Sequence, residues 1–115
     1  MDTAQIKAKL ELFASERDWD QFHSVRNLVL ALVGEVGELA ELLQWVDDAK
    51  VESFLDGGGR DSLSEEIADI LFYLIRLADK AGVDLDQAVR EKLDLNAVKY
   101  PVKKSRGVST KYTDL

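Results

Sequence analysis

Residues 27–45, NLVLALVGEVGELAELLQW, are the stretch from which the fold of this chain is predicted. In the first half of the run, apolar side chains occur on every side of a helix, whereas the second half is amphipathic. A helix that is apolar all round is typical of a buried position. Ser24 precedes the run and suits an N-cap. The pattern therefore predicts a long helix that begins after Ser24, continues towards Trp45 and is buried in its first half.

A second long helix is predicted further along the chain. Residues 62–65 read Ser-Leu-Ser-Glu, which has the form of a capping box. Apolar residues then recur at helical spacing until about Lys80, and Ala81-Gly82 would end the helix. Residues 47–61 contain three consecutive glycines and are predicted to form a flexible loop. Such a loop would let the two long helices pack antiparallel.

Two more helices complete the predicted fold. Residues 4–16 carry apolar side chains at helical spacing, and residues 18–23 form a connection. Residues 84–87 read Asp-Leu-Asp-Gln, a second capping-box candidate, and predict a helix that runs towards Lys99 and stops before Pro101. No segment alternates as a strand does. We therefore predict an all-α fold, a four-helix bundle.

Composition favours one folded domain in a reducing compartment. The chain has 115 residues, 46% of them hydrophobic, and no cysteine, so disulfides and thiolate chemistry are excluded. We expect a single domain over residues 1–100 followed by a basic tail over residues 101–115. The first residues do not have a basic start followed by an apolar run, and no eighteen apolar residues stand together, so secretion and membrane spanning are not expected. A cytoplasmic protein without a membrane partner is the expectation.

The charge distribution argues against nucleic-acid binding. The net charge is −7, although the charged residues from 97 onward are five basic and one acidic. An acidic body repels a phosphate backbone at long range. A small phosphate ligand would therefore need a cation or local basic residues beside it.

Four carboxylates have the spacing of a metal site. Glu35 and Glu38 lie three residues apart on the first long helix, and Glu66 and Asp69 repeat the spacing on the second. Residues three apart in a helix share one face, so antiparallel packing would bring the two pairs together. Converging carboxylates repel one another and need a compensating cation. A ligand set made only of oxygens favours Mg²⁺, or Mn²⁺ as a substitute.

Solvated surface charge is the alternative explanation, because Glu-x-x-Glu alone is a weak signal. Gly34 and Gly37 flank Glu35, and a glycine inside a helix costs about 1 kcal/mol relative to alanine. That cost suggests that some group approaches this helix face closely. The spacing alone does not decide between the two explanations, a metal site and solvated surface charges.

Aromatic residues share the helix faces of the carboxylates. Tyr73 falls on the stripe of Glu66 and Asp69, and Trp45 would fall on the stripe of the other pair if its helix extends that far. A nucleotide combines a charged end for a metal with a flat end for stacking on such rings. Simple packing roles for the two aromatic residues are equally open.

The single histidine, His23, excludes two other metal proteins. A ferritin-like di-iron bundle needs two Glu-x-x-His pairs, and a zinc protease needs His-Glu-x-x-His. The three glycines at 57–59 are also not followed by the Lys-Ser/Thr of a phosphate-binding P-loop. A lone histidine in a loop is more often structural than catalytic, although His23 could also hydrogen-bond a ligand.

Several motifs together resemble one known family. EVGELAELLQW at 35–45 followed by SEEIADILFYL at 64–74 resembles the E-x-x-E…E-x-x-D signature of the MazG-like all-α NTP pyrophosphatases. FASERDWDQFHSVRNL at 13–28, KLDLN at 92–96, YPVKKSRG at 100–107 and KYTDL at 111–115 are similar to the dCTP pyrophosphatase branch. The resemblance covers nearly the whole chain.

The resemblance implies magnesium-dependent hydrolysis of a deoxynucleoside triphosphate to the monophosphate and pyrophosphate, as house-cleaning of the nucleotide pool. It implies a tetramer, a dimer of dimers, with sites near the subunit interfaces. Where some relatives have a histidine in the first helix, this chain has Leu10. The resemblance implies the magnesium ligands Glu35, Glu38, Glu66 and Asp69. The substrate contacts that it implies are Trp19, Asp20, Gln21, Phe22, His23, Trp45, Tyr73, Lys92 and Asn96.

Three hypotheses for the function follow. The first is a pyrophosphatase for dCTP or a related or modified pyrimidine nucleotide. The second is the same reaction on dUTP or dATP, and the third is a helical oligomerisation module without catalysis. In the two enzymatic hypotheses, Glu41 or Glu65 could orient the attacking water, although both also suit a solvated helix surface.

Overall fold

The computed structural model describes residues 1–115, which form two compact units, Met1–Gly82 and Val83–Leu115. The first unit contains the helices α1 (Thr3–Glu16), η1 (Asp20–Phe22), α2 (Val25–Leu43), η2 (Asp48–Lys50), α3 (Val51–Phe54), η3 (Leu55–Gly59) and α4 (Arg60–Ala81). The second contains α5 (Leu85–Lys99), α6 (Val102–Ser105) and η4 (Tyr112–Asp114). The all-α prediction is confirmed, and the four long helices are the four predicted. One domain over residues 1–100 stays a prediction.

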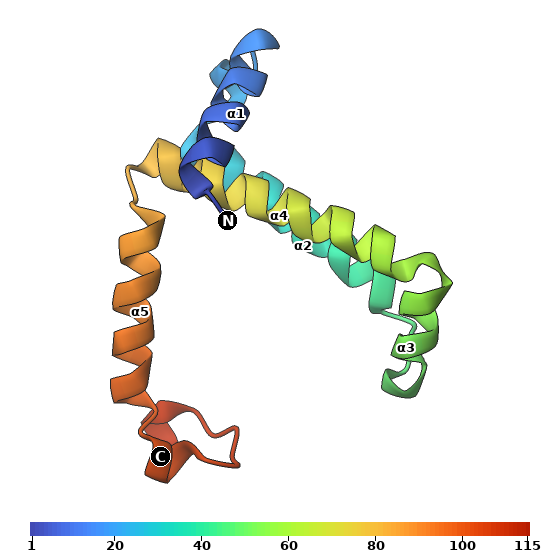
Figure 1. Cartoon of the computed structure of the whole chain (residues 1–115), viewed down its shortest axis with the longest axis vertical. Helices are drawn as coiled ribbons and strands as arrows, with labels where there is room; N and C mark the ends of the chain where they lie inside the picture. The colour runs from blue at the N-terminus through green and yellow to red at the C-terminus, as the bar shows by residue number, and fades with distance from the viewer. The chain divides into compact units, whose positions relative to one another are not determined.

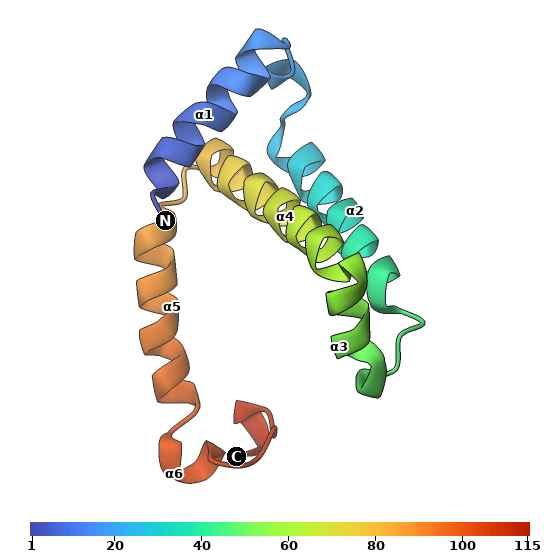
Figure 2. The same ribbon diagram turned by 45° about the vertical axis from the view of Figure 1, so that its right-hand side comes forward.

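The centre of the first unit is an antiparallel pair of helices, α2 and α4 (Figures 1 and 2). As predicted, Ser24 caps α2, because its Oγ accepts a hydrogen bond of 3.1 Å from the backbone N–H of Asn27. Leu28 of α2 and Ile75 and Ala78 of α4 are buried. Burial of these apolar side chains is the main source of stability for the pair.

Helix α1 packs against the C-terminal half of α4 (Figure 2). Its buried residue is Ala14, and the Nζ atom of Lys7 lies 3.2 Å from the Oδ1 atom of Asp79. The segment after α1 turns sharply at Asp18, whose φ is +53°. The single turn η1 follows, and α2 begins after it, so the segment from Asp18 to Ser24 connects α1 with the α2–α4 pair.

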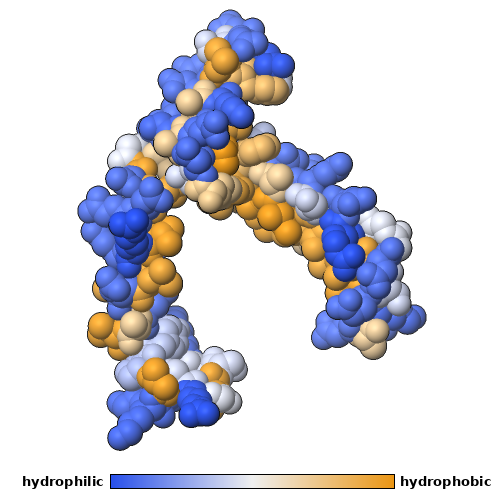
Figure 3. Space-filling model, viewed as in Figure 1, coloured by the Kyte–Doolittle hydropathy of each residue, from blue (hydrophilic) through white to orange (hydrophobic).

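Two expectations about α2 are wrong. The helix ends at Leu43, so Trp45 lies beyond it and not on the stripe of Glu35. The apolar first half is also not buried all round, since Leu30 is 54% exposed and Val33 is 63% exposed. The reason is that α4 packs along only one side of α2. Apolar surface is consequently visible along the α2–α4 pair (Figure 3).

The predicted loop over residues 47–61 is largely helical. After the extended residue Asp47 the chain passes through η2, α3 and η3, and within η3 Gly57 and Gly58 leave helical geometry, with φ of +104° at Gly58. Helix α4 begins at Arg60, so Ser62 is not its N-cap. The backbone N–H of Arg60 already donates to the Leu55 carbonyl, which makes a side-chain cap unnecessary there.

Gly59 is required by close packing with Phe54. A Cβ atom at Gly59 would lie 2.5 Å from the Phe54 carbonyl oxygen and 2.5 Å from its ring Cε1. Because the carbonyl belongs to the backbone, Gly59→Ala is expected to lower the free energy of unfolding by about 1–3 kcal/mol. Urea denaturation measures this difference.

Gly57→Ala is the matched control for this prediction. Its φ is −87°, and no atom lies within 4 Å of the position that a Cβ atom would take. Alanine there is expected to be neutral or to stabilise by about 0.4–1 kcal/mol through the unfolded state. Equal unfolding midpoints for the two variants would contradict the packing argument.

The second unit consists of α5 and the segment that follows it. As predicted, Asp84 caps α5, with its Oδ1 accepting from the Gln87 N–H at 3.1 Å, and the helix ends before Pro101. The rings of Tyr100 and Tyr112 then meet edge to face at 5.9 Å, so the chain after Pro101 folds back on the end of α5. No helix of either unit combines the length and apolarity that a membrane span requires.

Candidate functional site

Three carboxylates converge between α2 and α4. Glu35 and Glu38 come from α2 and Glu66 from α4, and one oxygen of each lies within 4.8 Å of the others. The Oε2 atoms of Glu35 and Glu66 are buried and have no hydrogen-bond partner. Buried carboxylate oxygens without a donor are costly. This donor set therefore fits a hard divalent cation.

The proximity of these groups changes their proton affinity. Burial, followed by the charge of Glu38, raises the pKa of Glu35 to about 7. Burial and the charge of Glu38 also raise the pKa of Glu66. The charge of Asp69 contributes to both shifts, which identifies it as a close neighbour of the cluster. A cation would remove the repulsion that favours protonation of these groups.

The metal-free protein is expected to become less stable as the pH rises from about 5 to 7. The pKa of Glu35 lies above its ordinary value of 4.5, so between 4.5 and about 7 the folded state binds a proton that the unfolded state releases. The stability that the protonated Glu35 contributes is complete below pH 4.5, and it is lost as the pH rises to about 7. A fall of about 4–8 °C in melting temperature per kcal/mol lost is expected.

Melting scans in EDTA measure this dependence, with Glu35→Gln as the control. A glutamine does not titrate, so the slope of melting temperature against pH between 5 and 7 should become shallower in that variant. A wild-type protein whose melting temperature rises through this interval, with a variant of identical slope, would contradict the assigned pKa shift.

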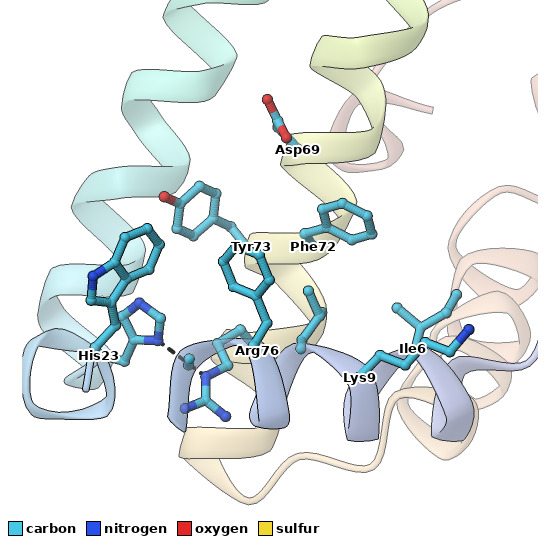
Figure 4. Close-up of a pocket in the computed structure, with 11 residues that line it drawn as sticks. Ile6, Lys9, His23, Asp69, Phe72, Tyr73 and Arg76 are labelled. Carbon is cyan, nitrogen blue, oxygen red and sulfur yellow. Dashed lines mark hydrogen bonds between the residues drawn. The ribbon is translucent and has the colours of Figure 1, made fainter. Parts of the chain in front are cut away.

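A cavity of about 660 Å³ lies in the first unit beside Asp69 (Figure 4). Its volume is within the range of small-molecule sites. The walls are mainly apolar and aromatic, and the Phe13 and Trp19 rings meet edge to face at 5.7 Å. The residues that line it are Ile6, Lys9, Leu10, Phe13, Ala14, Trp19, His23, Asp69, Phe72, Tyr73 and Arg76. A flat aromatic ligand would suit these walls.

Some of the predicted substrate residues share this cavity. Trp19, His23 and Tyr73 line it together with Asp69. Burial, followed by the charge of Glu35, raises the pKa of Tyr73, so this tyrosine lies between the cavity and the carboxylates. Aromatic wall and carboxylate cluster are therefore adjacent parts of one unit.

Other predicted substrate residues lie elsewhere. The Asp20 carboxylate accepts hydrogen bonds from Arg76 and Lys80, and the Gln21 amide donates to Asp18. The Phe22 side chain is 59% exposed and does not line the cavity. The roles predicted for these residues stay predictions.

Three more predicted residues are outside the cavity. Trp45 follows the end of α2 and is 87% exposed. Lys92 and Asn96 lie on α5, in the second unit.

Gly34 and Gly37 have no atom within 4 Å of the position that a Cβ atom would take, so the close approach expected at this helix face is not made by another part of the chain.

Sequence reasoning missed most of the α1 wall and Arg76. The α1 residues Ile6 and Phe13 follow the ordinary pattern of an amphipathic helix, which carries no sign of a ligand. Arg76 had a usable signal, because it interrupts the apolar run ILFYLIRLA and a charge there needs a buried partner. Arg76 is only 6% exposed.

Known proteins match most of this chain. A sequence model of the MazG-like family matches residues 31–115. The protein named dCTP pyrophosphatase 1 is 56% identical over 104 residues in Rattus norvegicus and 53% identical over 106 residues in Homo sapiens. Each match covers 90% of this chain and 61% of the relative, so the chain spans about three-fifths of these proteins.

A solved structure is matched over nearly its whole length. The crystal structure of a pyrophosphatase from Archaeoglobus fulgidus is 33% identical in sequence and superimposes with a TM-score of 0.80. The match covers 88% of this chain and 94% of that one. Fold and sequence therefore agree over almost the whole length of both proteins.

Proposed function

This chain belongs to the MazG-like family, and we propose that it is a nucleoside-triphosphate pyrophosphatase that hydrolyses a dNTP to dNMP and pyrophosphate. One observation carries the proposal. Buried carboxylate oxygens of Glu35 and Glu66 without partners lie beside a cavity of about 660 Å³ with aromatic walls. A cation site next to a base-sized cavity suits a nucleotide with its phosphates at one end and its base at the other.

The proposed cation is Mg²⁺, with Mn²⁺ as a substitute. Glu35, Glu38, Glu66 and Asp69 would hold it, because they offer only oxygen ligands. When bound, Mg²⁺ neutralises phosphate oxygens and lowers the pKa of a coordinated water. The unpartnered Oε2 atoms of Glu35 and Glu66 support this assignment.

The chain's own residues would orient the substrate. Trp19 and Tyr73 would pack on the faces of the base, and the apolar walls would exclude water from it. With the base held there, the triphosphate would be directed towards Asp69 and the three carboxylates of Glu35, Glu38 and Glu66. Glu41 and Glu65 are both exposed next to this cluster in sequence, and either could orient the attacking water.

We propose dCTP, or a related or modified pyrimidine nucleotide, as the preferred substrate. The support is 53–57% identity to proteins named dCTP pyrophosphatase 1. Leu10 lines the cavity, so at that point the wall is apolar. Trp45, Lys92 and Asn96 remain proposed contacts to the nucleotide, together with Asp20, Gln21 and Phe22. The alternative is the same reaction on dUTP or dATP.

A homotetramer in the cytoplasm completes the proposal. The exposed apolar side chains of α2, such as Leu30 and Val33, support association between copies of the chain. No nucleic-acid or membrane partner is proposed, in keeping with the net charge of −7.

A panel of deoxynucleoside triphosphates with Mg²⁺ tests the function. We expect release of pyrophosphate, not orthophosphate, with the highest kcat/KM for dCTP or a C5-substituted dCTP. Preference for dUTP or dATP would keep the reaction and change the base assignment. Absence of pyrophosphate from every triphosphate would contradict the enzymatic proposal and favour a non-catalytic helical module.

A further inference from the structure

Arg76 is a buried cation in the wall of the cavity. Its side chain is 6% exposed, and each of its three nitrogens faces a different partner. Nη2 donates to Asp20 Oδ1 at 2.6 Å, and Nη1 lies 3.5 Å from Asp79 Oδ2. Nε donates to His23 Nδ1 at 3.2 Å (Figure 4). Two carboxylates therefore compensate the buried charge, and the third nitrogen is directed at an imidazole.

The two carboxylates are themselves held by other side chains. Asp79 Oδ1 lies 3.2 Å from the Lys7 Nζ atom of α1. Asp20 also accepts a hydrogen bond from Lys80. Because a guanidinium is planar, anchoring Nη1 and Nη2 fixes the direction of Nε as well. Arg76 therefore presents a fixed N–H to His23.

This contact determines where the imidazole carries its proton. An arginine Nε–H only donates, so Nδ1 of His23 must be the unprotonated, accepting nitrogen. Burial, followed by the charge of Arg76, lowers the pKa of His23, which keeps the ring neutral at neutral pH. The proton of the neutral ring is then on Nε2. No protein group bonds to Nε2, and His23 lines the cavity.

We infer that Arg76 is a positioning residue that holds His23 as its Nε2–H tautomer, so that the cavity offers a fixed hydrogen-bond donor to an acceptor atom of the base. The ligand contact rests on the proposed function. A ring carbonyl or an unprotonated ring nitrogen satisfies this donor. An amino group or a protonated ring nitrogen at the same edge would face it donor to donor, with an uncompensated loss of hydration.

The tautomer is measurable in the nucleotide-free protein by ¹⁵N NMR of the imidazole. The chain has one histidine, so the ring signals need no further assignment. We expect an unprotonated Nδ1 signal and a protonated Nε2 signal at neutral pH. A protonated Nδ1, or rapid averaging of the two nitrogens, would overturn the inference whether or not the protein hydrolyses nucleotides.

Arg76→Met tests whether the arginine is the cause. Without the Nε donor the ring is expected to populate both tautomers, and its pKa is expected to rise because a cation has been removed. Arg60→Met is the matched control, since Arg60 lies on the same helix with its side chain 62% exposed. If Arg76→Met fails to fold, Asp20→Asn removes one anchor of the guanidinium and is expected to shift the tautomers partly. Unchanged tautomers in these variants would overturn the role of Arg76.

Binding of dCMP, measured by calorimetry, tests the contact to the base without requiring turnover. A glutamine amide can occupy the position of Nε2, whereas an asparagine amide reaches only the position of Nδ1. We therefore expect His23→Asn to weaken binding roughly three- to tenfold and His23→Gln to recover most of it. Equal affinities in both variants, or no binding of dCMP to the wild type, would overturn the contact. A wild type that binds dCMP but releases no pyrophosphate would contradict the proposed function alone.

Discussion

Glu38→Gln is expected to reduce magnesium-dependent pyrophosphate release by at least about a hundredfold in kcat/KM, since even groups that only support metal ligands cost 10- to 100-fold when changed. Glu38 is the exposed member of the three converging carboxylates. Its removal relieves repulsion on Glu35 and Glu66, so the metal-free variant should melt at the same temperature as the wild type or higher. Activity assays and melting scans on one preparation measure both effects.

The matched control for Glu38→Gln is Glu52→Gln on α3. Glu52 is exposed and outside both the cluster and the cavity, so the same chemical change there should leave activity and stability close to wild type. A Glu38→Gln variant with wild-type turnover would contradict the metal assignment. A variant that is inactive because it no longer melts cooperatively would point to a structural role for Glu38.

Removal of divalent cations by EDTA is expected to abolish pyrophosphate release completely and to lower the melting temperature. The unpartnered Oε2 atoms of Glu35 and Glu66 lose their proposed counter-charge, and the converging carboxylates then destabilise the fold. At a concentration 100 times Kd, a bound ion stabilises a protein by about 2.7 kcal/mol. Added Mg²⁺ or Mn²⁺ should restore both activity and melting temperature.

Two comparisons make the EDTA experiment decisive. Addition of K⁺ or Na⁺ at equal ionic strength should not restore activity, because charge screening alone does not provide a divalent cation that the phosphate oxygens can coordinate. In the Glu38→Gln variant, Mg²⁺ should raise the melting temperature less than in the wild type. Activity that persists in excess EDTA would contradict the dependence on a divalent cation.

The helices were predictable because their signals are local. Ser24 and Asp84 act as N-caps where the sequence placed them, and helical spacing of apolar residues located the long helices. The sequence around Ser62 did not indicate where α4 begins. The Leu55 carbonyl of η3 accepts a hydrogen bond from the Arg60 N–H, so the helix begins before Ser62 and needs no side-chain cap. The expectation that the first half of α2 is buried all round was wrong. Apolar residues indicate a preference for burial, but they do not indicate which helix will cover them.

The site was predictable to the extent that it depends on helix periodicity. The i, i+3 spacing of Glu35 and Glu38, with antiparallel packing, is enough to bring Glu66 beside them. The cavity was not predictable from the sequence. One of its walls comes from α4 and the other from α1, and the packing of α1 on α4 depends on contacts between residues distant in sequence. The bond from Arg76 to His23 joins residues 53 positions apart, which no local pattern encodes.

Helix α4 is joined to its two neighbours, α2 and α1, by different forces. Helix α2 is held to α4 by apolar packing around Leu28 and Ile75, an attraction that weakens on cooling. The α1 and η1 side is tied to α4 by ion pairs as well, with Lys7 on Asp79 and Arg76 on Asp20. The pair of Lys7 and Asp79 is partly exposed, and such an ion pair weakens as salt rises. Salt therefore acts on the contact between α1 and α4, whose residues line the cavity, so the width of the cavity can change with salt while the α2–α4 pair stays folded.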